Sequence, residues 1–494
     1  MIFNIADNVN LFFSDFFDVP AAKVKEYGAL NVSLISDLPL FIDPFLLFNS
    51  RKEAYRDLHD RIVRYVSFLR TKSVDHALEP NLIRAWYTFP EVRQTWLGFT
   101  KTGNEGRGLG IKFAGALHRN LSKVFGDFGK EKITKGSHLE KLCLIEEGVG
   151  RDNISDFVTN LIKEYLLDYT RDFASRHIDS SRCREFAVNN VSFNYETESW
   201  ESRIYSLPHF KGDFVLLTPK DMLTKDDTWI NRADFIQEFS AIPDSISDGQ
   251  LRALIDNFFK SRLPKIPTAK DVQQAAIETI IHFPELADYY IRLKEDTGSD
   301  AVSSSAEKVR TSEQLYVTQF SQLASLLHNS TSFYQLLGET CKEARERVLF
   351  LKDVIENKGG HKLFYVNGHP LEREEDLHIA YRLTWYGTPS DVSREVNDGR
   401  GPADFKVSRG AKDKAIVEFK LASNSHLKKN LKNQAEIYQK ASDAQCSIKV
   451  IVFFFKEQLD RVTSILTELG LNDDQNVVLI DARADNKPSA SKAS

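Results

Sequence analysis

The sequence predicts an α/β protein with more than one domain, and three observations support this fold class. The chain has 494 residues, which is too long for a single ordinary core. Its composition, 42% hydrophobic and 27% charged, is that of a folded protein. Stretches with helical periodicity alternate with short apolar runs, and the run at residues 447–455 (SIKVIVFFF) is typical of a strand buried on both faces.

Changes in pattern along the chain predict four segments. Residues 1–245 mix helical and strand patterns, and we expect an N-terminal α/β region for recognition or regulation, where an activating partner or ligand could bind. Residues 246–360 have a period of about 3.6 and predict a helical connector. Residues 361–483 predict a separate α/β unit, and residues 484–494 a disordered tail.

The predicted connector contains several helices. Residues 295–305 (EDTGSDAVSSS) are expected to interrupt them as a loop, because they are rich in small and polar residues. The sequence leaves two arrangements open for the helices between 302 and 358. They could form a homodimer interface or an intramolecular hairpin.

The charge and the cysteines restrict the class of protein. With a formal net charge of -5, a nucleic-acid site would have to be a local basic patch. The four cysteines lack CxxC spacing, so we expect reduced thiols in a cytoplasmic protein rather than a zinc site. The N-terminus has no basic region typical of a signal peptide. No apolar run approaches the roughly 20 residues that span a membrane, so no membrane association is expected.

The unit from residue 361 onward has a clear predicted order of elements. A helix at 371–386 precedes a hairpin of strands at 391–396 and 403–408, and a third strand follows at 415–422. A helix at 426–441 then leads to the apolar strand at 447–455. A helix at 459–469 and a strand at 476–481 complete the unit.

Strand alternation predicts a group of charged residues on one face of this unit. In the strand at 415–422, Glu418 and Lys420 share a face, and the residues between them turn toward the core. Asp404 points away from its apolar neighbours in the preceding strand. If the two strands pair as a hairpin, Asp404 and Glu418 can meet.

Two facing carboxylates repel each other, and a hard cation removes that penalty. Mg²⁺ or Mn²⁺ prefers such oxygen ligands, and it can polarise a phosphate and supply a hydroxide. We therefore predict that Asp404 and Glu418 bind the metal. Lys420 would orient the attacking water or offset negative charge in the transition state.

Asp404, followed by Glu418-Phe419-Lys420 after a hairpin and before a helix, resembles the PD-(D/E)xK nuclease superfamily. The proline of the motif is Pro402, so the dipeptide is loosened to Pro-Ala-Asp. Gln434 and Tyr438 on the next helix resemble the QxxxY motif of the RecB-type branch, and the resemblance covers roughly residues 365–482. It implies a restriction-endonuclease-like αβββαβ core, joined by the helical connector to the N-terminal region.

The resemblance also implies roles for further residues. Gln434 and Tyr438 would support the site and the substrate, although a polar helix surface with a core tyrosine is the alternative. Members often add a glutamate from the preceding helix, for which Glu375 is favoured; alternatively, Glu375 favours the helix dipole. Basic residues near the site could contact phosphates or simply be solvated: Arg400, Lys406, Arg409, Lys428, Lys429 and Lys432.

Together these patterns predict a metal-dependent deoxyribonuclease. The rest of the chain is similar to prokaryotic proteins that join a recognition region to such a nuclease, as host-defence proteins do. The rival from another class is a non-catalytic nucleic-acid-binding or scaffold protein with a retained nuclease fold. Cleavage of RNA instead of DNA is the rival within the class.

Overall fold

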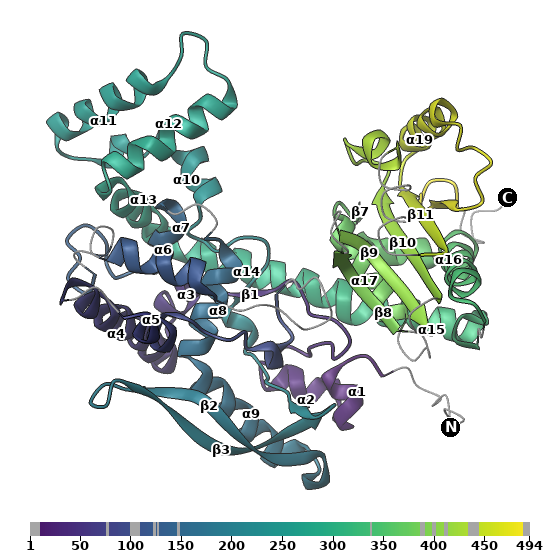
Figure 1. The fold of residues 1–494 in the computed structure, drawn as a ribbon, viewed down its shortest axis with the longest axis horizontal. Coiled ribbons are helices and arrows are strands. Elements are labelled where there is room, and N and C mark those ends of the chain that lie inside the picture. The colour runs from purple at the N-terminus through teal and green to yellow at the C-terminus, as the bar shows by residue number, and fades with distance from the viewer. Residues whose placement is uncertain are drawn as a thin grey trace.

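The computed structural model describes residues 10–487, except 76–78, 99–108, 122–124, 126–127, 146–148, 336–337, 386–390, 398–401, 410–412 and 433–443. Two lobes are visible in Figure 1, with a long helical run passing between them. The predicted mixed α/β class is confirmed. Among the described residues, no helix is both long and apolar enough to cross a lipid bilayer.

The N-terminal lobe combines helices with a long β-hairpin. Strands β2 and β3 pair antiparallel, with an irregularity between Val188 and Ser192, and α9 packs along them (Figure 1). The larger elements of this lobe are α4 Glu53–Asp75, α5 Pro80–Tyr87, α6 Ile111–Leu121, α8 Arg151–Leu161, α9 Lys163–His177, β2 Cys183–Asn194 and β3 Ser199–Phe210. The shorter ones are α1 Phe13–Phe17, α2 Ala21–Glu26, β1 Phe41–Ile42, α3 Pro44–Phe48, α7 Lys141–Ile145, β4 Asp213–Phe214, β5 Leu223–Thr224 and α10 Arg232–Glu238.

A helical projection extends from this lobe (Figure 1). It packs on the lobe through a second apolar core, which includes Phe45 of α3 and Phe235 of α10. Two of its helices, α11 and α12, begin at good N-caps, since Asp248 and Thr268 accept hydrogen bonds from their first turns. Tyr290 and Ile291 are buried in the shared core. The helices are α11 Gly249–Arg262, α12 Ala269–His282 and α13 Glu285–Asp296.

One helical run joins the lobes: α14 Gly298–Ser312, a π-helical segment η5 Glu313–Gln319 and α15 Phe320–Ser330. The prediction of a loop across residues 295–305 was wrong, because Gly298 opens α14. Ser303 donates its hydroxyl hydrogen to the Ser299 carbonyl oxygen at 2.7 Å, so a serine-rich segment is accommodated within the helix. Ala301 and Ser305 are small enough to be buried on its packed side.

Helix α16, Thr340–Asn357, packs against α15 within the chain, as an intramolecular hairpin requires. It also packs on the C-terminal sheet. A disulfide joins Cys341 of this helix to Cys446 of the sheet, 105 residues later, so the expectation of reduced thiols was wrong for this pair. The spacing of the cysteines in the sequence could not predict this disulfide, because only the folded chain brings Cys341 and Cys446 together. Cys143 and Cys183 are free.

The C-terminal lobe is built on a five-stranded sheet in the order β12-β11-β10-β9-β8. β8, β9 and β10 pair antiparallel, whereas β10, β11 and β12 pair parallel. The strands are β8 Asp391–Asn397, β9 Pro402–Arg409, β10 Asp413–Leu421, β11 Cys446–Phe453 and β12 Val477–Asp481. The remaining elements are α17 Glu374–Thr384, α19 Lys456–Leu469 and a two-residue hairpin, β6 Tyr365–Val366 with β7 His369–Pro370.

Both faces of this sheet are covered. Val417 and Val450 pack with Val348 of α16 in the main core, whereas Ile451 packs with Val462 of α19 in a separate cluster. The predicted strands and the helices expected at 371–386 and 459–469 are present, and of the helix expected at 426–441 the described residues 427–432 are helical. Strand β11 is buried along its whole length, which confirms the two-sided burial expected from its apolar sequence.

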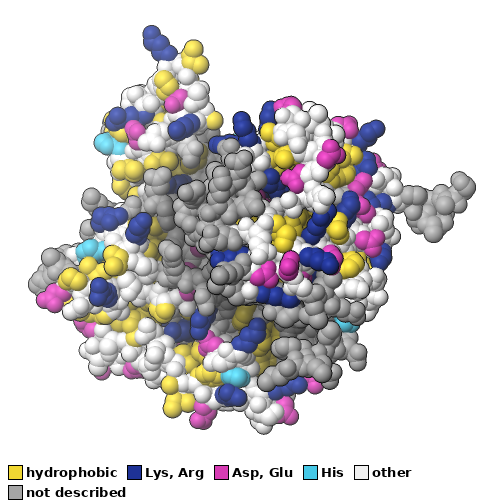
Figure 2. Space-filling model, turned by 45° about the vertical axis from the view of Figure 1, so that its right-hand side comes forward, with side chains coloured by type: hydrophobic (Ala, Val, Ile, Leu, Met, Phe, Trp, Pro, Cys, Tyr) yellow, Lys and Arg dark blue, Asp and Glu magenta, His cyan; other side chains and the backbone are white. Residues whose placement is uncertain are grey.

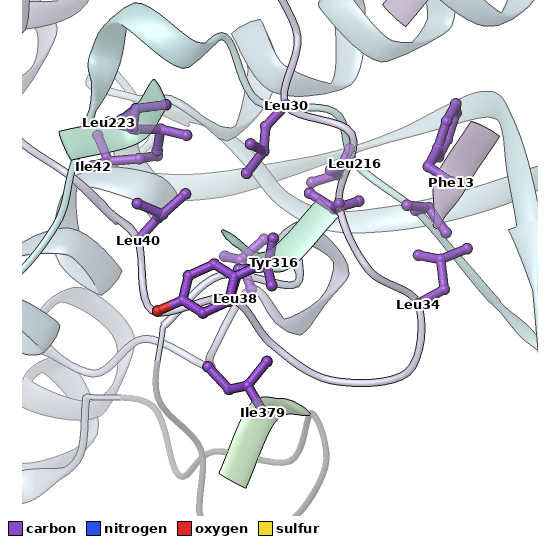
Figure 3. Packing of buried hydrophobic residues seen from close by; sticks show 14 of the residues in the cluster. Phe13, Leu30, Leu34, Leu38, Leu40, Ile42, Leu216, Leu223, Tyr316 and Ile379 are labelled. Carbon is purple, nitrogen blue, oxygen red and sulfur yellow. The ribbon is translucent and has the colours of Figure 1, made fainter. Parts of the chain in front are cut away.

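The main core is continuous between the two lobes. Figure 3 shows Leu38 and Leu40 of the N-terminal segment near Tyr316 of the helical run, with Ile379 of α17 beside them. The division expected at residue 360 falls between α16 and the sheet on which it packs. Of the expected tail, residues up to 487 are described, and Lys487 Nζ donates to Asp481 Oδ1 at 3.2 Å.

Candidate active site in the C-terminal sheet

The pairing of β9 with β10 positions the charged residues. Val417 pairs with Phe405, and continuing this antiparallel register by one residue places Glu418 opposite Asp404. Phe405 and Val417 are both buried in the main core. Strand alternation therefore turns Asp404 and Glu418 to the other side of their strands, as the sequence predicted.

Asp404 is the centre of a compact polar group. Its Oδ2 accepts a hydrogen bond from the backbone N–H of Phe419 at 2.8 Å and from Lys420 Nζ at 3.1 Å. His378 Nε2 of α17 lies 3.2 Å from the same oxygen. The three sequence-predicted residues Asp404, Glu418 and Lys420 are thus brought together with a histidine that the prediction missed.

A second carboxylate, Glu374, holds the lysine and the end of β10. Lys420 Nζ lies 3.5 Å from Glu374 Oε2. Glu374 Oε1 accepts hydrogen bonds from Leu421 N at 3.2 Å and from Asn424 Nδ2 at 2.7 Å. Lys420 is therefore placed between two carboxylates from different elements.

The structure places Glu374, rather than the favoured Glu375, in this group. Helix α17 begins at Glu374, and His378 lies four residues later on the same side of the helix. Glu375 is one step around the helix and interacts electrostatically with Asp152 of the N-terminal lobe. The i, i+4 spacing of Glu374 and His378 is the sequence signal that could have identified both residues.

The pKa values of Asp404 and Glu418 are shifted in opposite directions. Burial raises the pKa of Glu418 to about 7, and the nearby charge of Asp404 adds to this effect. Burial also favours protonation of Asp404, but His378 and Lys420 stabilise its charged form and hold its pKa at about 2. Near neutral pH Asp404 is therefore ionised, whereas Glu418 holds its proton far more strongly than an ordinary glutamate does.

The charge on Lys420 is stabilised by its neighbours. Burial favours the neutral amine, but the charges of Asp404, Glu374 and Glu418 outweigh burial and raise the pKa of Lys420. Only 8% of the Lys420 surface is exposed. The group therefore presents an ammonium ion in a site largely withdrawn from water.

Lys449 of β11 is a further residue that the sequence prediction missed. Its Cα pairs with that of Glu418 across the parallel strands, so the two side chains leave the sheet on the same face. It is 4% exposed, and burial lowers its pKa, although Asp474 and Glu418 oppose this shift. The sequence signal that could have identified Lys449 is its position as a single lysine within an otherwise apolar strand.

The donor set suits a hard divalent cation. Asp404 and Glu418 offer carboxylate oxygens, whereas His378 Nε2 faces Asp404 and stabilises its charged form. Glu418 Oε1 is buried and has no hydrogen-bond partner among the described residues, which is costly for a purely structural glutamate. Within the described part of the chain, no three acidic, histidine or cysteine side chains are already grouped as a metal cluster.

The other predicted site residues divide into three groups. Gln434, Tyr438 and Arg400 lie outside the described residues. Arg409 donates to Glu343 Oε2 at 2.5 Å and to the Gly338 carbonyl oxygen, so its guanidinium joins β9 to α16. Lys406 is half-buried, Lys428 pairs with Glu468, and Lys429 and Lys432 are exposed.

The described part of the helix after β10 packs on the C-terminal sheet. Residues 427–432 are helical, and Leu427 and Leu431 are buried in the cluster shared with α19. On the face shown in Figure 2, coloured basic side chains are interspersed with acidic ones. Near the polar group, the lysines that could contact a phosphate are the buried Lys420 and Lys449 and the exposed Lys429 and Lys432 of this helix.

Two family models match the chain. Residues 18–231 match a family described as a domain of unknown function (DUF8370). Residues 340–456 match another domain of unknown function (DUF8371), which contains α16, α17, β8 to β11 and the polar group described above. No curated protein and no solved structure matches the chain.

Proposed function

We propose that this protein is a metal-dependent nuclease that hydrolyses phosphodiester bonds in DNA. The observation that carries the proposal is the buried group of Asp404, Glu418 and Lys420, with His378 and Glu374 against it. The arrangement of α17, three antiparallel strands and the following parallel strand is consistent with the αβββαβ core of the PD-(D/E)xK superfamily. The host-defence role implied by the resemblance stays a prediction.

Asp404 and Glu418 would hold Mg²⁺ or Mn²⁺, and His378 would position the Asp404 carboxylate. When bound, the cation would neutralise the facing carboxylates and polarise the phosphodiester. Lys420, hydrogen-bonded to Asp404, is placed to orient the attacking water and to offset negative charge on the phosphate. Glu374 restrains the lysine from the opposite side, which limits the conformations that its long side chain can adopt.

The electrostatics favour a catalytic role over a purely structural one. A buried salt bridge can form from Asp404 and Lys420 alone, and Glu418 adds a repulsive carboxylate to it. Replacing such a residue by an apolar one is often neutral or stabilising. A scaffold that had lost catalysis would have no use for this unfavourable glutamate.

Cleavage assays test the proposal. Plasmid DNA, linear DNA and RNA are incubated with the full chain in Mg²⁺, Mn²⁺ or EDTA. We expect cleavage of DNA with either metal and none in EDTA. Asp404→Asn, Glu418→Gln and Lys420→Ala should each lower the rate by about 100-fold or more.

Lys414→Ala is the matched control, because Lys414 lies on the same strand but outside the polar group. It should retain the wild-type rate. Cleavage that is equally fast in the wild type and in the three site variants would contradict the proposal. Cleavage of RNA but not of DNA would support the proposed active site and would show that its substrate is RNA.

A further inference from the structure

A cavity of about 280 Å³ lies in the N-terminal lobe, apart from the proposed nuclease site. It lies between α4 and the β2–β3 hairpin, and Leu161 and Glu164 contribute at the junction of α8 and α9. Figure 1 shows these elements in the opposite lobe from β9 and β10. The cavity therefore needs an explanation of its own.

Aromatic residues from the hairpin form one wall of the cavity. Phe193, Tyr195 and Trp200 line it, and all three are only half-buried. The Phe193 ring centroid lies 5.1 Å from that of Tyr195 and 5.3 Å from that of Trp200. Tyr65 of α4 is buried behind them and fixes Phe193 through an edge contact at 5.0 Å. Phe193 is inclined by 78° to Tyr195 and by 70° to Trp200, so a planar ligand would stack on a single half-buried ring of the cluster.

Helix α4 supplies positive charge to the same cavity. Arg61 and Arg64 are three residues apart, so they project on the same side of the helix, and both are exposed. Arg61 pairs with Glu164 at 2.7 Å, and Arg203 pairs with the same carboxylate. Glu164 is therefore already neutralised by two arginines.

Arg64 is the remaining cation of the cavity. Its guanidinium carbon lies 4.0 Å from the Tyr195 ring centroid, so the charge is held against the aromatic wall. Within the described part of the chain, it makes no ion pair with a carboxylate. Half-buried aromatic rings beside an unneutralised guanidinium suit a ligand that is both aromatic and anionic.

We propose that this cavity binds a nucleobase together with its phosphate. The base would stack on the aromatic wall, and Arg64 would contact the phosphate. The Ser192 side chain also lines the cavity, but its hydroxyl already donates to Glu201 Oε2 at 3.3 Å and accepts from Arg203 Nη2 at 3.0 Å, so recognition depends on the rings and Arg64. A free nucleotide and an unpaired nucleotide in a single strand share this chemistry, and the experiment separates them.

Binding is measured with the full chain in EDTA, so that the result does not depend on the proposed nuclease activity. The probes are the four nucleoside monophosphates by calorimetry, and a labelled single-stranded oligonucleotide and its duplex by fluorescence anisotropy. Saturable binding of a monophosphate would identify a free nucleotide as ligand. Binding of the single strand alone, in preference to the duplex, would identify an unpaired base.

Arg64→Ala and Tyr195→Leu should each weaken the binding by about tenfold or more. Arg56→Ala is the matched control, because Arg56 is an exposed arginine on the same helix that does not line this cavity. It should bind as the wild type does. Absence of binding to every probe, equal binding of duplex and single strand, or equal losses in Arg56→Ala and Arg64→Ala would overturn the proposal.

Discussion

Glu418 occupies an electrostatically unfavourable position, because it is buried beside the charge of Asp404. Its pKa in the folded protein is raised to about 7, so the folded state binds a proton more tightly than the unfolded state does. Its contribution to stability is fully present below the ordinary glutamate pKa and is lost as pH rises through about 7. Above this pH the buried carboxylate lowers the free energy of unfolding.

Glu418→Gln should therefore stabilise the protein while it lowers the proposed nuclease activity. At pH 8 without metal, we expect the free energy of unfolding to rise by roughly 1–3 kcal/mol, because the buried charge is removed. Denaturant unfolding at pH 5 and pH 8 measures this, and the gain should be smaller at pH 5. Glu457→Gln, at an exposed glutamate, is the control. Destabilisation by Glu418→Gln at pH 8 would show that the glutamate has a structural role.

Lys449 should set the pH at which Glu418 ionises. Its positive charge lowers the pKa of Glu418, so Lys449→Met should raise that pKa further above about 7. The pH below which the cleavage rate falls should then be higher in the variant, because the metal needs the ionised carboxylate. The pH below which Mn²⁺ affinity falls should shift in the same direction. A pH profile of the variant beside the wild type checks this. An unchanged pH profile would exclude electrostatic coupling between the two residues.

At the scale of elements, strand alternation and helical periodicity in the sequence predicted which side chains share a face of a strand or helix. The faces of β9 and β10 were predictable because apolar residues flank Asp404 and Glu418. Contacts between distant elements were not predictable from one sequence. The choice between Glu374 and Glu375 depends on where α17 begins, and a shift of one residue changes the side of the helix that faces the site.

The disulfide between α16 and β11 also belongs to this scale. It closes a loop of 105 residues, so its loss should lower the free energy of unfolding by about 2–5 kcal/mol. Thermal unfolding of wild type with and without a reductant measures this, with Cys341→Ser as control, because that variant should not respond to the reductant. An identical mass before and after reduction would show that the bond does not form.

At the scale of the whole molecule, the two lobes share one apolar core. Leu38, Tyr316 and Ile379 come from segments far apart in sequence and belong to the same cluster (Figure 3). The sequence showed a change of pattern near residue 360, but composition cannot show which helices pack on which sheet. A domain boundary drawn from pattern alone therefore separates α16 from its packing partners.

This packing predicts the behaviour of fragments. A fragment of residues 361–494 lacks α16 and exposes Val417 and Val450, so it should be poorly folded. A fragment of residues 298–494 keeps α14 to α16 and should resist proteolysis better. Circular dichroism and limited proteolysis compare the two fragments with the full chain. Full-chain stability in the shorter fragment would contradict this description of the core.

The most direct test of the proposed nuclease site is metal binding, because it requires neither the correct substrate nor an activator. Mn²⁺ is titrated calorimetrically into the full chain, Asp404→Asn, Glu418→Gln and the Lys414→Ala control. We predict a saturable site in the wild type and the control, about 100-fold weaker or absent in the two site variants. Its affinity should fall below pH 7 as Glu418 takes up a proton. Equal Mn²⁺ binding in all four proteins, or none at millimolar Mn²⁺, would contradict a metal-dependent site at Asp404 and Glu418.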